Sequence, residues 1–175
     1  MPARRSVILG GLFGAIASVP TNGAARGPSR AIAAPWVRRV FHMYTGADGA
    51  SLIRAVPAPK LGAASTARLL RRPAERLTVG TIAPGFMMDF HIANQPNYLI
   101  PIIGTLVVQL KDGSSWSFGP GDILFAEDCT GGGHRSGAGP EGCFSVSVQI
   151  ARTDHCDSTT GPPANVLLGG DISTP

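Results

Sequence analysis

Two histidines, His91 and His134, are the residues of this 175-residue chain that are best suited to chemistry. His91 lies in an apolar stretch with strand character, and His134 follows the glycine run 131–133. Alternate side chains of a strand share a face, so Met87, Asp89 and His91 are expected to point the same way. If that face is the interior of a sheet, the two imidazoles can meet across a pocket. Imidazole nitrogens suit Mn, Fe, Ni, Cu and Zn alike.

The spacing around His91 resembles the first motif of the cupin family. That motif has a glycine, five residues, a His-x-His pair, then a glutamate and a closing glycine. Here Gly85 precedes His91 by five intervening residues, and Gly104 closes the motif in register. Two positions depart from the pattern, because Ala93 stands where the second histidine would be and Asn97 stands where the glutamate would be.

The second cupin motif is matched more loosely. Phe-Gly-Pro-Gly-Asp-Ile-Leu at 118–124 is similar to a cupin hairpin, but His134 arrives two residues late and Glu127 occupies the usual proline position. The resemblance spans residues 85–134. It implies an all-β chain folded as a single cupin-type jelly-roll β-barrel.

The resemblance also implies a metal shell of three histidines and one carboxylate, of which this chain keeps His91 and His134. Asn97 offers a neutral amide oxygen, and Asp89 offers a replacement carboxylate. The expected metal site is therefore one divalent ion (Mn, Fe, Ni, Cu or Zn) held by His91, His134, Asn97 and Asp89. Asp89 is an awkward partner for His91, since two residues along a strand span roughly 7 Å.

A second interpretation needs no metal. Asp89, Glu127 or Asp128 is able to orient His91 or His134 as a general acid–base, because histidine exchanges protons near neutral pH. The family that the chain resembles includes metal-free sugar epimerases and isomerases. The missing histidine and glutamate also favour a non-catalytic ligand-binding or sensing barrel. A structural partner protein with a vestigial pocket stays open as well.

Apolar side chains around the histidines predict a pocket with few polar groups. Met87 and Phe125 are expected to contact the substrate. Such a lining suits a small, partly apolar organic ligand. The same side chains are equally able to fill a closed barrel.

The elements that must position these residues are short strands. The chain has 23 glycines and 15 prolines without a repeating period, which favours a turn-rich β protein. Asp112-Gly113 predicts a hairpin, Pro101 a bulge or an edge position, and 65–76 a helix of about two turns that Pro73 ends. The predicted strands are 36–44, 51–56, 67–70, 77–82, 86–92, 98–103, 106–110, 115–118, 122–125, 144–150 and 166–168.

The N-terminus has the pattern of an export signal. Arg4 and Arg5 precede the uncharged run Ser6–Val19, and small residues follow. The two arginines also resemble the twin-arginine form of the signal. The run is shorter than the roughly 20 residues that cross a bilayer, so we expect no stable membrane anchor and a periplasmic or secreted protein. The predicted organisation is an export signal peptide (1–33), a cupin β-barrel (34–156) and a C-terminal tail (157–175).

The positive charge belongs to that signal. The chain carries 15 Lys+Arg against 11 Asp+Glu, a formal net charge of +4. Cleavage after Ala33 would leave 11 basic and 11 acidic residues, so no nucleic-acid partner is expected. The expected partner is a small-molecule ligand, and the cupin resemblance adds a homodimer.

The cysteines predict a disulfide rather than a metal site. Cys129, Cys143 and Cys156 form no Cys-x-x-Cys pair, which argues against structural zinc. An exported protein meets oxidising conditions. The predicted disulfide is Cys129–Cys143, which would stiffen the glycine-rich loop that bears His134.

Overall fold

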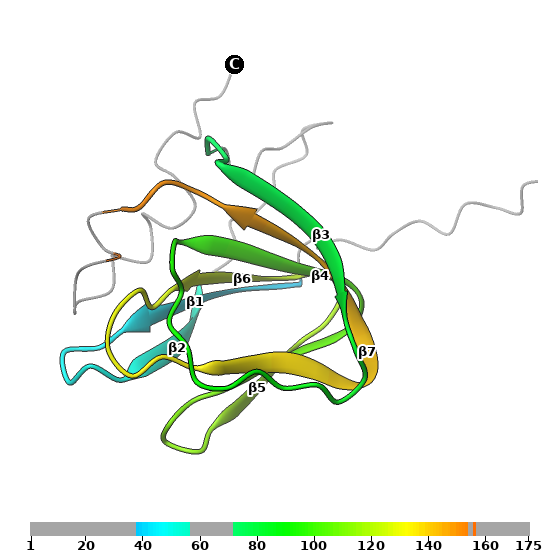
Figure 1. Cartoon of the computed structure of the whole chain (residues 1–175), viewed down its shortest axis with the longest axis horizontal. Helices are drawn as coiled ribbons and strands as arrows, with labels where there is room; N and C mark the ends of the chain where they lie inside the picture. Colours follow the sequence, from blue (N-terminus) through cyan, green and yellow to red (C-terminus); the bar gives the residue numbers. More distant parts are fainter. Residues whose placement is uncertain (1–37, 57–71, 154–155, 157–175) are drawn as a thin grey trace, which may run out of the picture. The chain divides into compact units, whose positions relative to one another are not determined.

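A computed structural model of the chain describes residues 38–56, 72–153 and 156, and these fold into an all-β unit (Figure 1). The all-β prediction is confirmed. Among these residues no helix is long and apolar enough to span a bilayer. The strands are β1 (Arg39–Thr45), β2 (Ser51–Val56), β3 (Arg76–Ile82), β4 (Asn97–Gln109), β5 (Ser115–Phe118), β6 (Asp122–Glu127) and β7 (Arg135–Gln149).

The strands join in one mixed sheet with the order β2-β1-β6-β4-β7-β3. The pairing of β1 with β6 is parallel, and the other pairings are antiparallel. β4 pairs with β6 through its first residues and with β5 through its last ones, while β7 follows it along its other edge. This branching at β4 goes with the strong curl of the sheet in Figure 1.

Two irregularities in β4 allow this long strand to bend. Its register against β7 shifts between Pro101 and Ile103 and again between Gly104 and Leu106. Of the two expectations for Pro101, a bulge or an edge position, the bulge is therefore the one that is confirmed. Gly104 has φ of 73°, and a Cβ there would lie 2.1 Å from the carbonyl oxygen of Gly142, so only glycine fits. Because bulges bend a strand without ending it, the two predicted strands 98–103 and 106–110 are one.

The segment 86–92, predicted as a strand, makes only isolated bridges to β7 and its approach. One of them joins His91 and His134 through two backbone hydrogen bonds of 2.9 and 2.8 Å. The close approach requires Gly133, where a Cβ would lie 2.3 Å from the His91 carbonyl oxygen. Without a continuous ladder, the alternation of side chains expected of a strand does not hold in this segment.

The other strand predictions that fall on described residues are confirmed. They are 51–56, 77–82, 115–118, 122–125 and 144–150, together with 39–44 of the first predicted strand. In the Asp112-Gly113 hairpin the Gly113 N–H donates to the Leu110 carbonyl. The strands 67–70 and 166–168, the signal 1–33 and the tail 157–175 lie outside the described residues, as does the predicted helix 65–76 up to residue 71. Its described end, 72–76, is not helical, and Arg76 begins β3.

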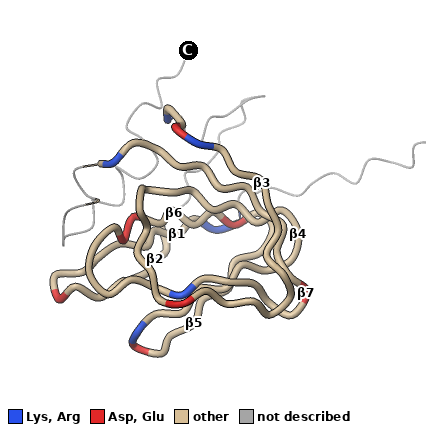
Figure 2. The backbone as a smooth tube through the Cα atoms, in the orientation of Figure 1, with Lys and Arg blue, Asp and Glu red and all other residues tan. Residues whose placement is uncertain are grey.

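Both faces of β1 and β6 are buried, and they belong to different clusters. Alternate residues supply one core that includes Phe41, Met43 and Leu124, and a second that includes Val40 and Phe125. Few charged residues lie along the strands, and turns and strand ends carry most of them (Figure 2). Consecutive residues at the end of β6 therefore face two different interiors.

One ion pair secures the start of the parallel pair. Arg39 donates to both carboxylate oxygens of Asp122, at 3.0 and 2.6 Å, and the Gly119 N–H donates to the same carboxylate. Burial alone would raise the pKa of Asp122, but the hydrogen bonds from Arg39 and Gly119 outweigh it and lower the pKa.

The predicted Cys129–Cys143 disulfide is wrong, because Cys129 pairs with Cys156 and Cys143 is a buried free thiol. Residues 135–142 are not loop but the first half of β7. At about 3.3 Å per residue they place Cys143 roughly 30 Å along the strand from His134. The Cys129–Cys156 disulfide instead ties the end of β6 to the segment after β7, and it is compatible with an oxidising compartment.

Candidate functional site

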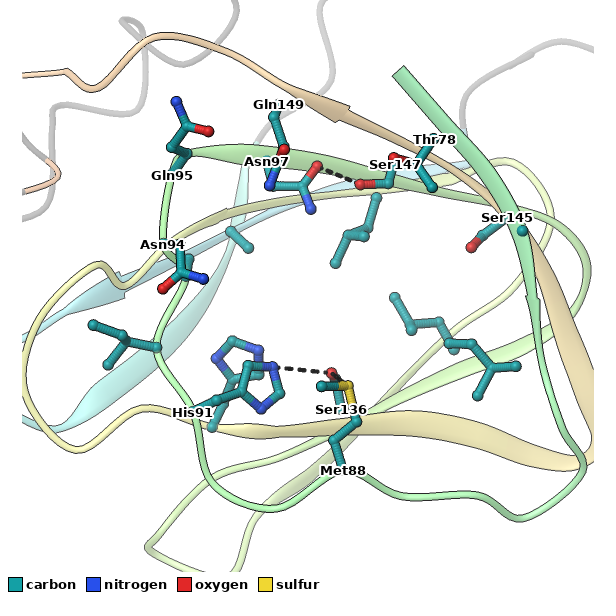
Figure 3. Close-up of a pocket in the computed structure, with 18 of the residues that line it drawn as sticks. Thr78, Met88, His91, Asn94, Gln95, Asn97, Ser136, Ser145, Ser147 and Gln149 are labelled. Carbon is teal, nitrogen blue, oxygen red and sulfur yellow. Dashed lines mark hydrogen bonds between the residues drawn. The ribbon is translucent and has the colours of Figure 1, made fainter. Parts of the chain in front are cut away.

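The candidate site is a pocket of about 390 Å³ bordered by β3, β4, β7 and the segment 88–97. Three predicted site residues, His91, Asn97 and His134, line it together. Figure 3 shows His91 and Asn97 on opposite sides of this pocket. The structure thus brings together the two histidines and the amide singled out by the sequence.

The other three predicted site residues are not among the lining residues. Asp89 is exposed, and it meets His91 only through its backbone carbonyl. Met87 is half-buried and bridges to Gly137. Phe125 is buried on the other side of β6, where its ring stacks on Tyr98. Asp89 and Met87 miss the pocket because their segment is not a regular strand.

The tautomer of His91 follows from its partners. Its Nδ1 lies 2.7 Å from the carbonyl oxygen of Asp89, which only accepts, so the ring proton is on Nδ1. In the neutral ring Nε2 is then the acceptor, to which the Ser136 hydroxyl donates at 3.3 Å (Figure 3). In that tautomer His91 turns a lone pair toward Ser136.

His134 is held by a buried carboxylate. Its Nδ1 lies 2.7 Å from Asp128 Oδ2, and the Ser51 hydroxyl donates to the same oxygen at 2.6 Å. Asp128 is fully buried and His134 is 3% exposed. With Nδ1 committed to Asp128, Nε2 is the nitrogen left to meet a ligand in the pocket. The rings of His134 and His91 have centroids 4.5 Å apart.

Sequence reasoning missed a row of hydroxyl and amide groups on the wall opposite the histidines. Ser145, Ser147 and Gln149 alternate along β7 and all line the pocket, next to Thr78 of β3. The Ser147 hydroxyl donates to Asn97 Oδ1 at 2.8 Å (Figure 3). The signal was present as a period-two polar pattern inside an otherwise apolar strand.

A second pair of histidine and carboxylate lies on the other side of β6. His42 Nε2 is 3.0 Å from Glu127 Oε2, and the Thr153 hydroxyl donates to the other oxygen of Glu127. The His42 ring stacks on Phe125 with centroids 5.5 Å apart. Both partners are buried, and neither lines the pocket.

The buried surroundings of this second pair also raise the pKa of a neighbouring tyrosine, Tyr98. Tyr98 is 4% exposed and stacks on Phe125. Burial raises the pKa of Tyr98 to about 12; the positive charge of Arg72 and a hydrogen bond to it oppose the shift, and the Glu127 carboxylate adds to it.

The described donors do not fit the metal shell that the cupin resemblance implies. His91 and His134 supply two imidazoles, but the Asn97 amide oxygen accepts from Ser147 and Asp89 is outside the pocket lining. Within the described ranges no group of three or more His, Cys, Asp or Glu side chains is arranged to hold a metal ion. No chemical step is therefore assigned to a metal.

No family model and no curated protein matches the sequence. Solved structures show weak likeness. A protein from Neisseria meningitidis is 13% identical over 53% of this chain and 90% of its own, with a TM-score of 0.37. An RmlC-like cupin family protein with a double-stranded β-helix fold, from Methanocaldococcus jannaschii, is 17% identical over 54% of this chain and 95% of its own, with a TM-score of 0.35. A putative ethanolamine utilization protein Q from Salmonella typhimurium is 16% identical over 67% of this chain and 98% of its own, with a TM-score of 0.31.

Proposed function

We propose that this chain is a cupin-type barrel that binds a small organic molecule in the His91–His134 pocket and exchanges a proton with it without a metal ion. The observation that carries the proposal is the buried contact between His134 Nδ1 and Asp128 Oδ2 in the wall of that pocket. A carboxylate on one imidazole nitrogen fixes the tautomer and leaves the other nitrogen as a base.

The proton transfer that this geometry supports begins at a C–H bond next to a carbonyl group. His134 Nε2 takes the proton, and the electron pair of the C–H bond moves onto the carbonyl oxygen. The imidazolium that forms is stabilised by the Asp128 carboxylate, as in other carboxylate–histidine pairs. Return of the proton to the opposite face of the same carbon inverts that centre, which is an epimerisation. Return of the proton to the former carbonyl carbon, with the hydroxyl proton of the first carbon passing to the former carbonyl oxygen, is an isomerisation.

The test is deuterium exchange. Protein dialysed against a chelator is incubated in D₂O with hydroxyketones and aldoses, and loss of the C–H signal is followed by proton NMR. We expect wild type to exchange one such proton, and Asp128→Asn to slow the exchange by about 100-fold or more.

The matched control is Glu127→Gln, the same change at the adjacent residue, which faces away from the pocket. It is expected to leave the exchange rate unchanged. Equal loss in both variants would contradict the proposal, as would exchange that appears only after a divalent metal is added. Binding without exchange at any tested carbon would leave a non-catalytic binding barrel.

A further inference from the structure

The wall opposite the histidines has no role in the proposed proton transfer, but its side chains indicate what kind of ligand the pocket binds. It consists of hydroxyl and amide side chains on β3, the start of β4 and β7, which we call the polar shelf: Thr78, Asn97, Ser145, Ser147 and Gln149. Figure 3 shows the shelf on the far side of the pocket from His91 and Ser136.

The shelf has hydrogen-bonding capacity that the protein leaves open. Gln149 Oε1 is buried and accepts no hydrogen bond from the described residues. A buried acceptor without a partner is costly, so a donor from a ligand is the natural complement. Asn97 uses its oxygen to accept from Ser147, which leaves its NH₂ group as the donor. Asn97 and Gln149 are cross-strand partners on β4 and β7, so the donor and the acceptor belong to neighbouring side chains, as binding of vicinal hydroxyls requires.

Charge is absent from the described lining. It contains no Lys, Arg, Asp or Glu, although carboxylate and phosphate ligands are normally met by Arg or Lys. Around the rim, Glu75 accepts a hydrogen bond from Gln95, and Arg135 and Arg152 donate to the backbone carbonyls of Met88 and Asn94. The rim therefore carries charges of both signs, and it is the lining itself that favours an uncharged ligand.

The lining also contains apolar side chains, including Leu99 and Leu106 of β4 and Ile82 of β3. A ring with C–H groups on its face and hydroxyls at its edge matches a lining that combines apolar and polar side chains. The volume, about 390 Å³, is near the lower end of ligand pockets, which suits one small ring.

We infer that the ligand is an uncharged, hydroxyl-rich ring of monosaccharide size, whose hydroxyls bind the polar shelf. The inference rests on the pocket of the proposed function, but it does not depend on proton transfer.

Isothermal titration calorimetry with neutral aldohexoses and pentoses, the matching uronic acids and the matching sugar phosphates tests it. Neutral sugars are expected to bind at least tenfold more tightly than their charged counterparts. Ser147→Ala and Gln149→Leu are each expected to weaken binding about tenfold. Ser117→Ala, at an exposed serine of β5 outside the pocket, is the matched control and is expected to bind like wild type.

A variant that gains affinity for a charged sugar provides a control, because a misfolded protein would lose affinity for every ligand. Ser145→Lys places a cation on the shelf and is expected to bind the uronic acid at least tenfold better than wild type does. The inference is overturned if charged sugars bind wild type more tightly than neutral ones, if no neutral sugar binds, or if the shelf variants lose no affinity. Neutral sugars that bind without any C–H exchange would refute the proposed proton transfer and keep this inference. Exchange on charged compounds alone would do the reverse.

Discussion

Glu127 and Asp128 are neighbours in the chain, yet each holds a histidine in a different interior. Asp128 meets His134 at 2.7 Å in the wall of the pocket, and Glu127 meets His42 at 3.0 Å among stacked aromatic rings. The two contacts are chemically alike, and all four residues are almost fully buried. What separates them is access, since only His134 borders a space that a ligand can enter.

The comparison shows that a histidine–carboxylate contact is not by itself a catalytic feature. The Glu127–His42 pair joins β1, the end of β6 and Thr153 after β7, so it ties three parts of the chain together. The Asp128–His134 pair joins the pocket to β2 through Ser51. We therefore interpret the first pair as structural and the second as functional.

The largest expected effect separates the two pairs by stability. Glu127→Ala removes the carboxylate that contacts His42, whose ring stacks on Tyr44 and Phe125, and it is expected to lower the free energy of unfolding by about 3–5 kcal/mol. Asp128→Ala should cost less, about 1–3 kcal/mol, because His134 borders the pocket and water from the pocket can fill the space that the carboxylate leaves. Urea unfolding of both variants measures the difference. A larger loss for Asp128→Ala would reverse our assignment of the two roles.

A somewhat smaller effect is expected from opening the structural pair to solvent. The Cys129–Cys156 disulfide closes a loop of 27 residues, and its removal in Cys129→Ala/Cys156→Ala should cost about 3–4 kcal/mol. The variant is also expected to make His42 reactive toward diethyl pyrocarbonate, as mapped by mass spectrometry. Cys143→Ala, which keeps the disulfide, is the control. A His42 that stays unreactive in the double variant would show that the disulfide does not help to cover it.

The smallest expected effect is on the titration of Tyr98, which reports whether water reaches the aromatic cluster around Glu127 and His42. Because the folded pKa of Tyr98 is raised to about 12, the neutral phenol stabilises the fold fully below the unfolded value of about 10. That contribution is lost as the pH rises through about 12. Absorbance titration at alkaline pH is expected to show a late tyrosinate phase that Tyr98→Phe removes while keeping the ring stacked on Phe125. Ionisation of Tyr98 near the ordinary value would mean that water reaches this face.

Local chemistry made most of the fold predictable. Short apolar clusters between turn residues located β2, β5 and β6, the Asp112-Gly113 pair predicted its hairpin, and Pro101 predicted a bulge or an edge position, of which the bulge is present. These features depend on a few adjacent residues, so their sequence is sufficient evidence. The prediction of a regular strand at 86–92 was wrong, because contacts with β7 and His134 set the path of this segment, and its own apolar pattern does not.

The site residues that belong to a spaced sequence motif could be predicted, whereas those whose position depends on long-range strand contacts could not. His91, Asn97 and His134 share the pocket as their spacing suggested, and Asp128 was among the acids considered as a partner for the histidines. The disulfide partner of Cys129 and the placement of Asp89 depend on how far β7 extends and on where 86–92 crosses it. Neither quantity is encoded in a short window of sequence.

Because Glu127 and Asp128 are adjacent and face different interiors, their contacts depend on the number of residues in β6. Inserting or deleting one codon within β6 would exchange the faces of the two acids, so that the longer glutamate would approach His134 and the aspartate would turn toward His42. A change of two codons would restore the faces. Insertions or deletions in β6 are therefore expected to preserve both histidine–carboxylate contacts only when they change its length by an even number of residues.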